Sequence, residues 1–152
     1  MIYIILNDHY QHTIDDISMW KEYYVPVRVL VIDDDTDTVD VFSEFLELKG
    51  LEVVGTGHDG KEAVEAYKKF KPDIVLMDVM MPVYDGFYAI NHIRKIDPKS
   101  KIIMVTADLS VKTKEKLREM NVSGVIFKPY DIDRVLDVIH SIEGGQTVFL
   151  SI

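Results

Sequence analysis

Short apolar runs alternate with longer amphipathic segments from residue 27 onward. Five runs are rich in β-branched residues, are apolar at nearly every position and are too short for helices: Val27–Ile32, Val53–Gly55, Ile74–Met77, Ile102–Val105 and Val125–Phe127. A strand that is covered on both faces shows this continuous pattern, whereas a half-exposed strand alternates apolar and polar residues. The pattern therefore predicts five strands of a parallel sheet with helices on both faces.

The segments between these runs have the spacing of helices. In residues 132–139 the apolar side chains follow the i, i+3, i+4, i+7 pattern, and Asp131 stands at the N-cap position. Lys49-Gly50 is expected to end the first helix, because glycine readily adopts the left-handed conformation at a helix end. Five β–α units with right-handed crossovers predict the α/β class and a doubly wound sheet.

The two ends of the chain differ from the main domain, residues 27–143. Residues 1–26 form an N-terminal extension with a strand-like start, Met1–Leu6, and weak helical spacing over Ile14–Tyr24. Residues 144–152 form a strand-like C-terminal tail. Because exposed apolar strands invite association, we expect the tail and Met1–Leu6 to pair with each other or across a homodimer.

Composition and charge restrict the classes of partner. The 152 residues are 47% hydrophobic and 28% charged, as in an ordinary folded domain, and the formal net charge is −9. This charge repels phosphate backbones and anionic lipids, so we expect neither a nucleic acid nor a membrane partner. The absence of cysteine excludes thiolate metal sites and cysteine nucleophiles. With no secretory signal and no apolar run long enough to span a membrane, a cytoplasmic location is expected.

Polar residues follow four of the five predicted strands. They are Asp33-Asp34-Asp35, Asp78, Thr106 and Lys128-Pro129. Ligands of open parallel sheets bind at the carboxyl ends of the strands, so these side chains should meet at one edge. Clustered carboxylates repel one another unless a cation joins them, and Mg²⁺ suits carboxylate and phosphate oxygens. The arrangement predicts a metal-dependent phosphoryl site.

Four motifs together resemble the receiver domain of two-component response regulators. They are Val31-Ile32-Asp33-Asp34-Asp35, Asp78-Val79-Met80-Met81-Pro82 with Asp85-Gly86, Val105-Thr106-Ala107, and Phe127-Lys128-Pro129. The resemblance extends over residues 27–143 and implies a flavodoxin-like sheet with strand order 2-1-3-4-5. Asp85-Gly86 is expected to be structural, as a turn and helix start.

The resemblance implies that Asp78 is the phospho-acceptor, which takes a phosphoryl group from a histidine kinase or a phosphotransfer protein. Asp34, Asp78 and the backbone carbonyl of Met80 would hold Mg²⁺ (or Mn²⁺), and Asp33 would act mainly through metal-bound water. The protein would be a signalling phospho-acceptor rather than an enzyme. It would hydrolyse its own phosphate slowly, at a rate tuned by Met80 and Asp108.

The other matching positions concern the phosphoryl group itself. The resemblance implies that Lys128 pairs with Asp78 before transfer and with a phosphoryl oxygen afterwards. Thr106 and Ala107 would stabilise the phosphoryl group, with the Thr106 hydroxyl swinging toward it. The Lys128–Pro129 peptide would be cis, which proline allows at a cost of about 0.5–1 kcal/mol.

One position departs from the family pattern. Receiver domains often carry an aromatic switch residue three positions before the lysine, and this chain has Val125 there. Valine has little surface to expose or hide, so the sequence does not favour the usual coupling between threonine and aromatic residue. Phe127 is expected to lie on the wrong side of the strand for this role, and Tyr130 beyond its end.

Three functions remain in consideration. The first is a stand-alone receiver that relays phosphate or binds an unidentified target protein when phosphorylated, since only nine residues follow Glu143. The second is a phosphatase of the haloacid dehalogenase type, because Asp35-Thr36-Asp37-Thr38-Val39 fits its D-x-D-x-[TV] signature, with Asp35 as nucleophile. In the receiver, Asp35 or Thr36 would instead cap the following helix. The third is a degenerate receiver that only binds partners.

Overall fold

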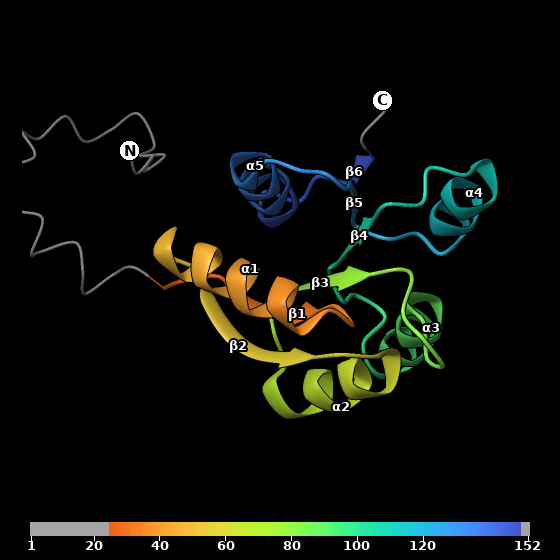
Figure 1. Ribbon diagram of the computed structural model, residues 1–152, viewed down its shortest axis with the longest axis horizontal. Coiled ribbons are helices and arrows are strands. Elements are labelled where there is room, and N and C mark those ends of the chain that lie inside the picture. Colours follow the sequence, from red (N-terminus) through yellow and green to blue (C-terminus); the bar gives the residue numbers. More distant parts are fainter. Residues whose placement is uncertain (1–24, 150–152) are drawn as a thin grey trace, which may run out of the picture.

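The computed structural model describes residues 25–149, which form a six-stranded parallel sheet of order β2-β1-β3-β4-β5-β6 (Figure 1). The strands are β1 (Arg28–Ile32), β2 (Glu52–Gly57), β3 (Ile74–Asp78), β4 (Ile102–Thr106), β5 (Gly124–Phe127) and β6 (Val148–Phe149). The helices are α1 (Thr36–Leu48), α2 (Gly60–Phe70), α3 (Gly86–Ile96), α4 (Val111–Glu119) and α5 (Ile132–Glu143). The predicted α/β class and the strand order 2-1-3-4-5 are confirmed.

Helices cover both faces of the sheet (Figure 1). They enclose two apolar cores, one on each face. Helices α2, α3 and α4 contribute to one core, and α1 and α5 contribute to the other. Successive strand residues point to opposite faces, so Leu30 and Ile32 enter the first core while Val29 and Val31 enter the second. This double burial explains why the central strands are apolar at nearly every position.

Each helix begins behind a side chain that accepts a hydrogen bond from a backbone N–H of the first turn. The capping residues are Asp35, Asp59, Asp85, Ser110 and Asp131. The predicted caps at Asp131 and at the start of the first helix are therefore confirmed. Lys49 and Gly50, with φ of 90° at Gly50, end α1 as the sequence predicted. Within residues 25–149, no helix is both long and apolar enough to cross a membrane.

The two edge strands of the sheet, β2 and β6, differ from what the sequence predicted. Strand β2 is longer than Val53–Gly55, because an exposed edge strand also includes polar residues such as Glu52 and Thr56. In the tail, Val148 and Phe149 pair in parallel with β5 of the same chain, a partner that the sequence did not indicate. Met1–Leu6 and residues 150–152 lie outside the described residues.

A partly buried hydrogen bond joins α2 to the residue that follows α3. The Tyr67 hydroxyl donates to Asp97 Oδ2 at 2.7 Å, and the Tyr67 side chain is buried. Burial raises the pKa of the Tyr67 hydroxyl, and the bond to Asp97 raises it further. The same bond, together with the Lys99 N–H, holds the pKa of the Asp97 carboxyl below its ordinary value. A carboxyl group whose pKa falls on folding stabilises the folded state above its unfolded pKa.

We expect Tyr67→Phe to lower the free energy of unfolding at neutral pH by about 1–2 kcal/mol, the usual contribution of such a bond. The difference from the original protein should shrink as the pH falls through the folded-state pKa of Asp97, because the protonated carboxyl no longer favours the bond. Urea unfolding at neutral and acidic pH measures both effects. Tyr88→Phe is the control, since the Tyr88 hydroxyl has no hydrogen bond within residues 25–149; an equal loss there would contradict the prediction.

Candidate functional site

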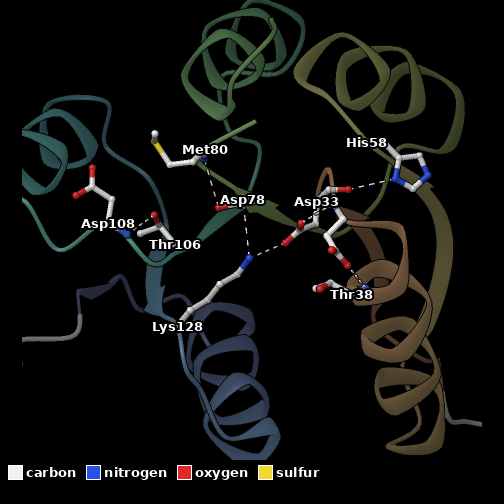
Figure 2. Close-up of polar contacts among 9 residues, drawn as sticks. Asp33, Thr38, His58, Asp78, Met80, Thr106, Asp108 and Lys128 are labelled. Atoms are coloured by element: carbon white, nitrogen blue, oxygen red, sulfur yellow. Dashed lines mark hydrogen bonds and ion pairs between the residues drawn. The ribbon is translucent and has the colours of Figure 1, made fainter. Parts of the chain in front are cut away.

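Four strands bring polar side chains to the carboxyl edge of the sheet (Figure 2). Asp78 is the last residue of β3, and Thr106 is the last residue of β4. Asp33 follows β1 directly and Lys128 follows β5 directly. The parallel register places Asp78 opposite Val105 and Thr106 opposite Phe127, so the strand ends lie at similar levels.

Lys128 lies between two buried carboxylates (Figure 2). Its Nζ donates a hydrogen bond to Asp33 Oδ2 at 2.7 Å and forms an ion pair with Asp78 Oδ2 at 3.6 Å. The other carboxylate oxygen of Asp33 accepts a hydrogen bond from the Asp35 N–H at 3.0 Å. The family resemblance implied a Lys128–Asp78 pair, and the structure has that pair, but the shorter contact of Lys128 is with Asp33.

The three predicted acidic residues meet in space. One carboxylate oxygen from each of Asp33, Asp34 and Asp78 lies within 4.8 Å of the other two. Asp33 and Asp78 are buried, and Asp34 is exposed to solvent. Three carboxylates face a single ammonium group, so negative charge is in excess and a divalent cation would relieve the repulsion. This set of hard oxygen donors with an exposed member fits Mg²⁺ or Mn²⁺.

Asp78 and Lys128 shift each other's pKa values. Burial raises the pKa of the Asp78 carboxyl, while the Lys128 charge opposes the rise. Burial alone would lower the pKa of Lys128, but the hydrogen bond that Lys128 donates to Asp33 and the charge of Asp78 outweigh it, so this pKa is raised. The ammonium group is therefore held firmly charged beside a carboxylate that is more basic than an ordinary aspartate.

Thr106, at the end of β4, and Asp108, on the loop that follows, lie on one side of this pair (Figure 2). Thr106 is fully buried, and its Oγ1 accepts a hydrogen bond from the Asp108 N–H at 3.0 Å. The Asp108 carboxylate accepts hydrogen bonds from Ser110 and from the Thr113 hydroxyl. Those bonds direct the Asp108 side chain to the start of α4 rather than to Asp78 (Figure 2).

The remaining predicted positions surround Asp78 and Lys128. The Met80 N–H donates to Asp78 Oδ1 at 3.3 Å, and the Met80 side chain is 61% exposed. Ala107 is exposed on the loop after β4. The Lys128–Pro129 peptide is cis, as the resemblance implied.

A close backbone contact fixes the loop after β3. A Cβ on Gly86 would lie 2.5 Å from the Asp78 carbonyl oxygen, so only glycine lets α3 begin this close to the strand end. The Asp85 carboxylate caps the same helix by accepting the Tyr88 N–H at 2.8 Å. The predicted structural role of Asp85-Gly86 is confirmed.

Asp35 lies outside the acidic cluster. Its carboxylate accepts the Thr38 N–H at 2.7 Å and caps α1, and this bond lowers the pKa of the carboxyl. A carboxylate committed to a helix start is poorly placed to act as a nucleophile. The dehalogenase signature in the sequence is therefore explained by helix capping.

The sequence analysis assigned no role at the site to two residues that lie near it. His58 follows β2, and its Nδ1 lies 3.2 Å from the Asp33 carbonyl oxygen. Its position directly after the second strand was a signal that could have found it. Tyr130 lies half-buried near Lys128, and burial raises the pKa of its hydroxyl.

The prediction for Phe127 was wrong. Val125 is buried in the core beneath α2, α3 and α4, and Phe127 packs against the same core. Residues two apart on a strand point to the same face, which explains why the two side chains share it. The Lys114 Nζ lies 5.3 Å from the centre of the Phe127 ring. An aromatic ring therefore lies on the α4 side of β5, two residues after Val125.

Comparison with known proteins gives consistent matches. Residues 29–140 match the model of the response regulator receiver domain. The chemotaxis protein CheY of Thermotoga maritima is 36% identical over 115 residues, which cover 76% of this chain and 96% of CheY. The response regulator VraR of Staphylococcus aureus is 32% identical over 124 residues, which cover 81% of this chain and 59% of VraR.

A solved structure agrees with the same assignment. A chain of the CheX–CheY–BeF3–Mg complex from Borrelia burgdorferi is 30% identical in sequence and superposes with a TM-score of 0.74. The match covers 78% of this chain and 90% of that chain. That complex contains Mg²⁺, the ion that the acidic cluster of the present structure fits.

We expect Mg²⁺ to raise the melting temperature, because an ion that binds only the folded state stabilises it. At about 100 times the dissociation constant the gain is about 2.7 kcal/mol. Asp34→Asn should weaken the effect, whereas Asp37→Asn, an exposed aspartate outside the cluster, should leave it unchanged. Thermal melting during a Mg²⁺ titration measures these shifts. A melting temperature that does not respond to millimolar Mg²⁺ would contradict the metal assignment.

We expect Lys128→Met to raise the pKa of Asp78 further, because burial then acts without the opposing ammonium charge. The carboxylate form will then predominate only at a higher pH than in the original protein. NMR titration of the Asp78 carboxyl carbon without divalent ions gives the pKa. Lys101→Met, which breaks the surface ion pair with Glu143, is the matched control and should not move it. An unchanged Asp78 pKa in Lys128→Met would refute the electrostatic coupling.

Proposed function

Because this chain belongs to the response regulator receiver domain family, a group of signalling phospho-acceptors, we propose that Asp78 is its phosphorylation site. The donor is the phosphohistidine of a histidine kinase or of a phosphotransfer protein. The observation that carries the proposal is the position of Asp78, which is buried at a strand end within ion-pair distance of Lys128 and inside the acidic cluster.

In the proposed transfer, a carboxylate oxygen of Asp78 attacks phosphorus, and the bond between phosphorus and the donor histidine nitrogen breaks. Asp33, Asp34, Asp78 and the Met80 carbonyl would hold a divalent cation, which supplies neutralisation of phosphoryl charge. The chain's own contribution is to position the nucleophile and to exclude water.

Charged and polar groups of the chain then stabilise the acyl phosphate. Lys128 exchanges its 3.6 Å contact with Asp78 for one with a phosphoryl oxygen. The Thr106 hydroxyl and the backbone of Ala107 add hydrogen bonds to the phosphoryl group. The bonds of Asp108 to α4 support a motion in which this loop moves as one unit with Thr106.

Hydrolysis of the acyl phosphate would end the signal. We propose that this autodephosphorylation is slow and that the residues flanking Asp78 set its rate. The exposed Met80 side chain is placed to restrict water access. The Asp108 carboxylate points toward α4, so its influence would be exerted through the position of the loop rather than by direct contact.

The proposed output is binding of a target protein when Asp78 is phosphorylated. The match to Thermotoga CheY over 96% of that protein's length supports output by the receiver itself. VraR, in which the match covers 59%, is a longer relative, so attachment to a further domain is the alternative. A cytoplasmic location and the lack of a nucleic acid partner remain predictions from the sequence.

Specific observations weigh against the two rival functions. A dehalogenase-type phosphatase would need Asp35 as nucleophile, but the Asp35 carboxylate caps α1. A degenerate receiver would lack part of the site, whereas Asp33, Asp34, Asp78 and Lys128 all meet here. Both observations favour phosphoryl acceptance.

We expect the full-length protein to gain the mass of one phosphoryl group when it is incubated with acetyl phosphate and Mg²⁺. Asp78→Ala should abolish the gain because the nucleophile is removed, and a chelator should abolish it in the original protein. Asp35→Ala should retain it, with a loss of about 1 kcal/mol of stability from the missing helix cap. Intact-mass spectrometry measures the product. Phosphorylation that persists in Asp78→Ala but disappears in Asp35→Ala would establish the dehalogenase alternative.

A further inference from the structure

An exposed apolar stripe runs along α1. The side chains of Val41, Phe45 and Leu48 are 54%, 47% and 74% exposed. Their i, i+4, i+7 spacing places them on one face of the helix. Contiguous apolar surface of this kind on a soluble domain indicates a contact surface.

The stripe borders an open groove between α1 and the start of α5. The groove has a volume of about 540 Å³, and its lining includes Val41 and Phe45 from α1 and Tyr130 and Ile132 near the start of α5. Phe42 of α1 also lines the groove, and the centroid of its ring lies 5.4 Å from the centroid of the Tyr130 ring. The lining is mainly apolar, so an occupant should contribute apolar or aromatic side chains.

The described part of the chain begins near the C-terminal end of α1, one of the two helices that border the groove (Figure 1). Val27 packs against the core that α1 and α5 share, and its carbonyl accepts the Glu52 N–H at 3.0 Å just after α1 ends. The Lys49–Asp133 ion pair, at 3.1 Å, joins the end of α1 to the first turn of α5. Residues 1–24 therefore join the domain near the end of α1, within reach of the groove.

The length and composition of residues 1–24 suit the groove. An extended chain of 24 residues reaches about 80 Å, whereas α1, with 13 residues, is about 20 Å long. The predicted helical stretch contains Ile14, Ile17, Trp20 and Tyr24 at spacings of three and four residues. A short tether also gives an effective concentration on the order of millimolar, which populates weak apolar contacts that a free partner would not make.

We propose that residues 1–24 dock on this α1 groove of their own chain, with Trp20 and neighbouring apolar side chains covering Val41 and Phe45. The proposal does not depend on phosphoryl transfer. Phe42 and Tyr130 also line the small cavity next to Asp33 and Asp78, so the docked segment lies beside the candidate site. The other occupants of the groove would be a second copy of the chain or a separate protein.

The sequence provides its own reporter, because Trp20 is the only tryptophan in the chain. The experiment measures the emission maximum of Trp20 and its quenching by acrylamide in the full-length protein, with a synthetic peptide of residues 1–24 as the exposed reference. Docking predicts blue-shifted emission and quenching several-fold weaker than in the peptide. Phe45→Lys and, independently, Val41→Lys should restore quenching to the peptide level.

Ile96→Lys is the matched control, because Ile96 is 44% exposed on α3, across the sheet from the groove. Circular dichroism confirms the fold of each variant. Protection of Trp20 that is independent of protein concentration and is lost only in the two α1 variants supports the proposal. It is overturned if Trp20 is as accessible as in the peptide, if neither α1 variant releases it, or if Ile96→Lys releases it equally. Protection that disappears on dilution also overturns it and assigns the groove to a second copy.

Discussion

The repulsion among three aspartates at one edge of the sheet is the constraint on which the site depends. Asp33 and Asp78 are buried, and charged carboxylates are costly to bury unless cations offset them. Lys128 supplies one positive charge through contacts of 2.7 Å and 3.6 Å, which leaves an excess of negative charge. The folded domain therefore presents a place where a divalent cation, and with it a phosphoryl group, is electrostatically favoured.

The architecture makes this costly arrangement stable. The strands that carry Asp33 and Asp78 are covered by apolar cores on both faces, so their positions are fixed by packing far from the charges. Side-chain caps begin the helices at the same edge, and Gly86 lets α3 start against the end of β3. Strands packed on both faces hold Asp78 and position Asp33 and Lys128, and the loops between strands and helices carry the other residues of the site.

The candidate site and the α1 groove share residues. Phe42 and Tyr130 line both the cavity beside Asp78 and the open groove. Because protein interiors are closely packed, a shift of these two rings on the cavity side alters the packing on the groove side. On the opposite side of the site, Thr106 is linked through Asp108 to the start of α4, and Phe127 lies beneath Lys114. The acidic cluster thus lies between two surfaces, one on α1 and one on α4.

The sequence by itself determined the fold class, the strand order through its family resemblance, and the identity of the acidic cluster. It did so because continuous apolar runs specify buried parallel strands, and the residues that end those runs must meet at one edge. Only the tertiary structure decided that Lys128 bonds most closely to Asp33, that His58 approaches the Asp33 backbone, and that β6 pairs with β5. These features depend on distances between segments far apart in the chain, which local periodicity does not encode.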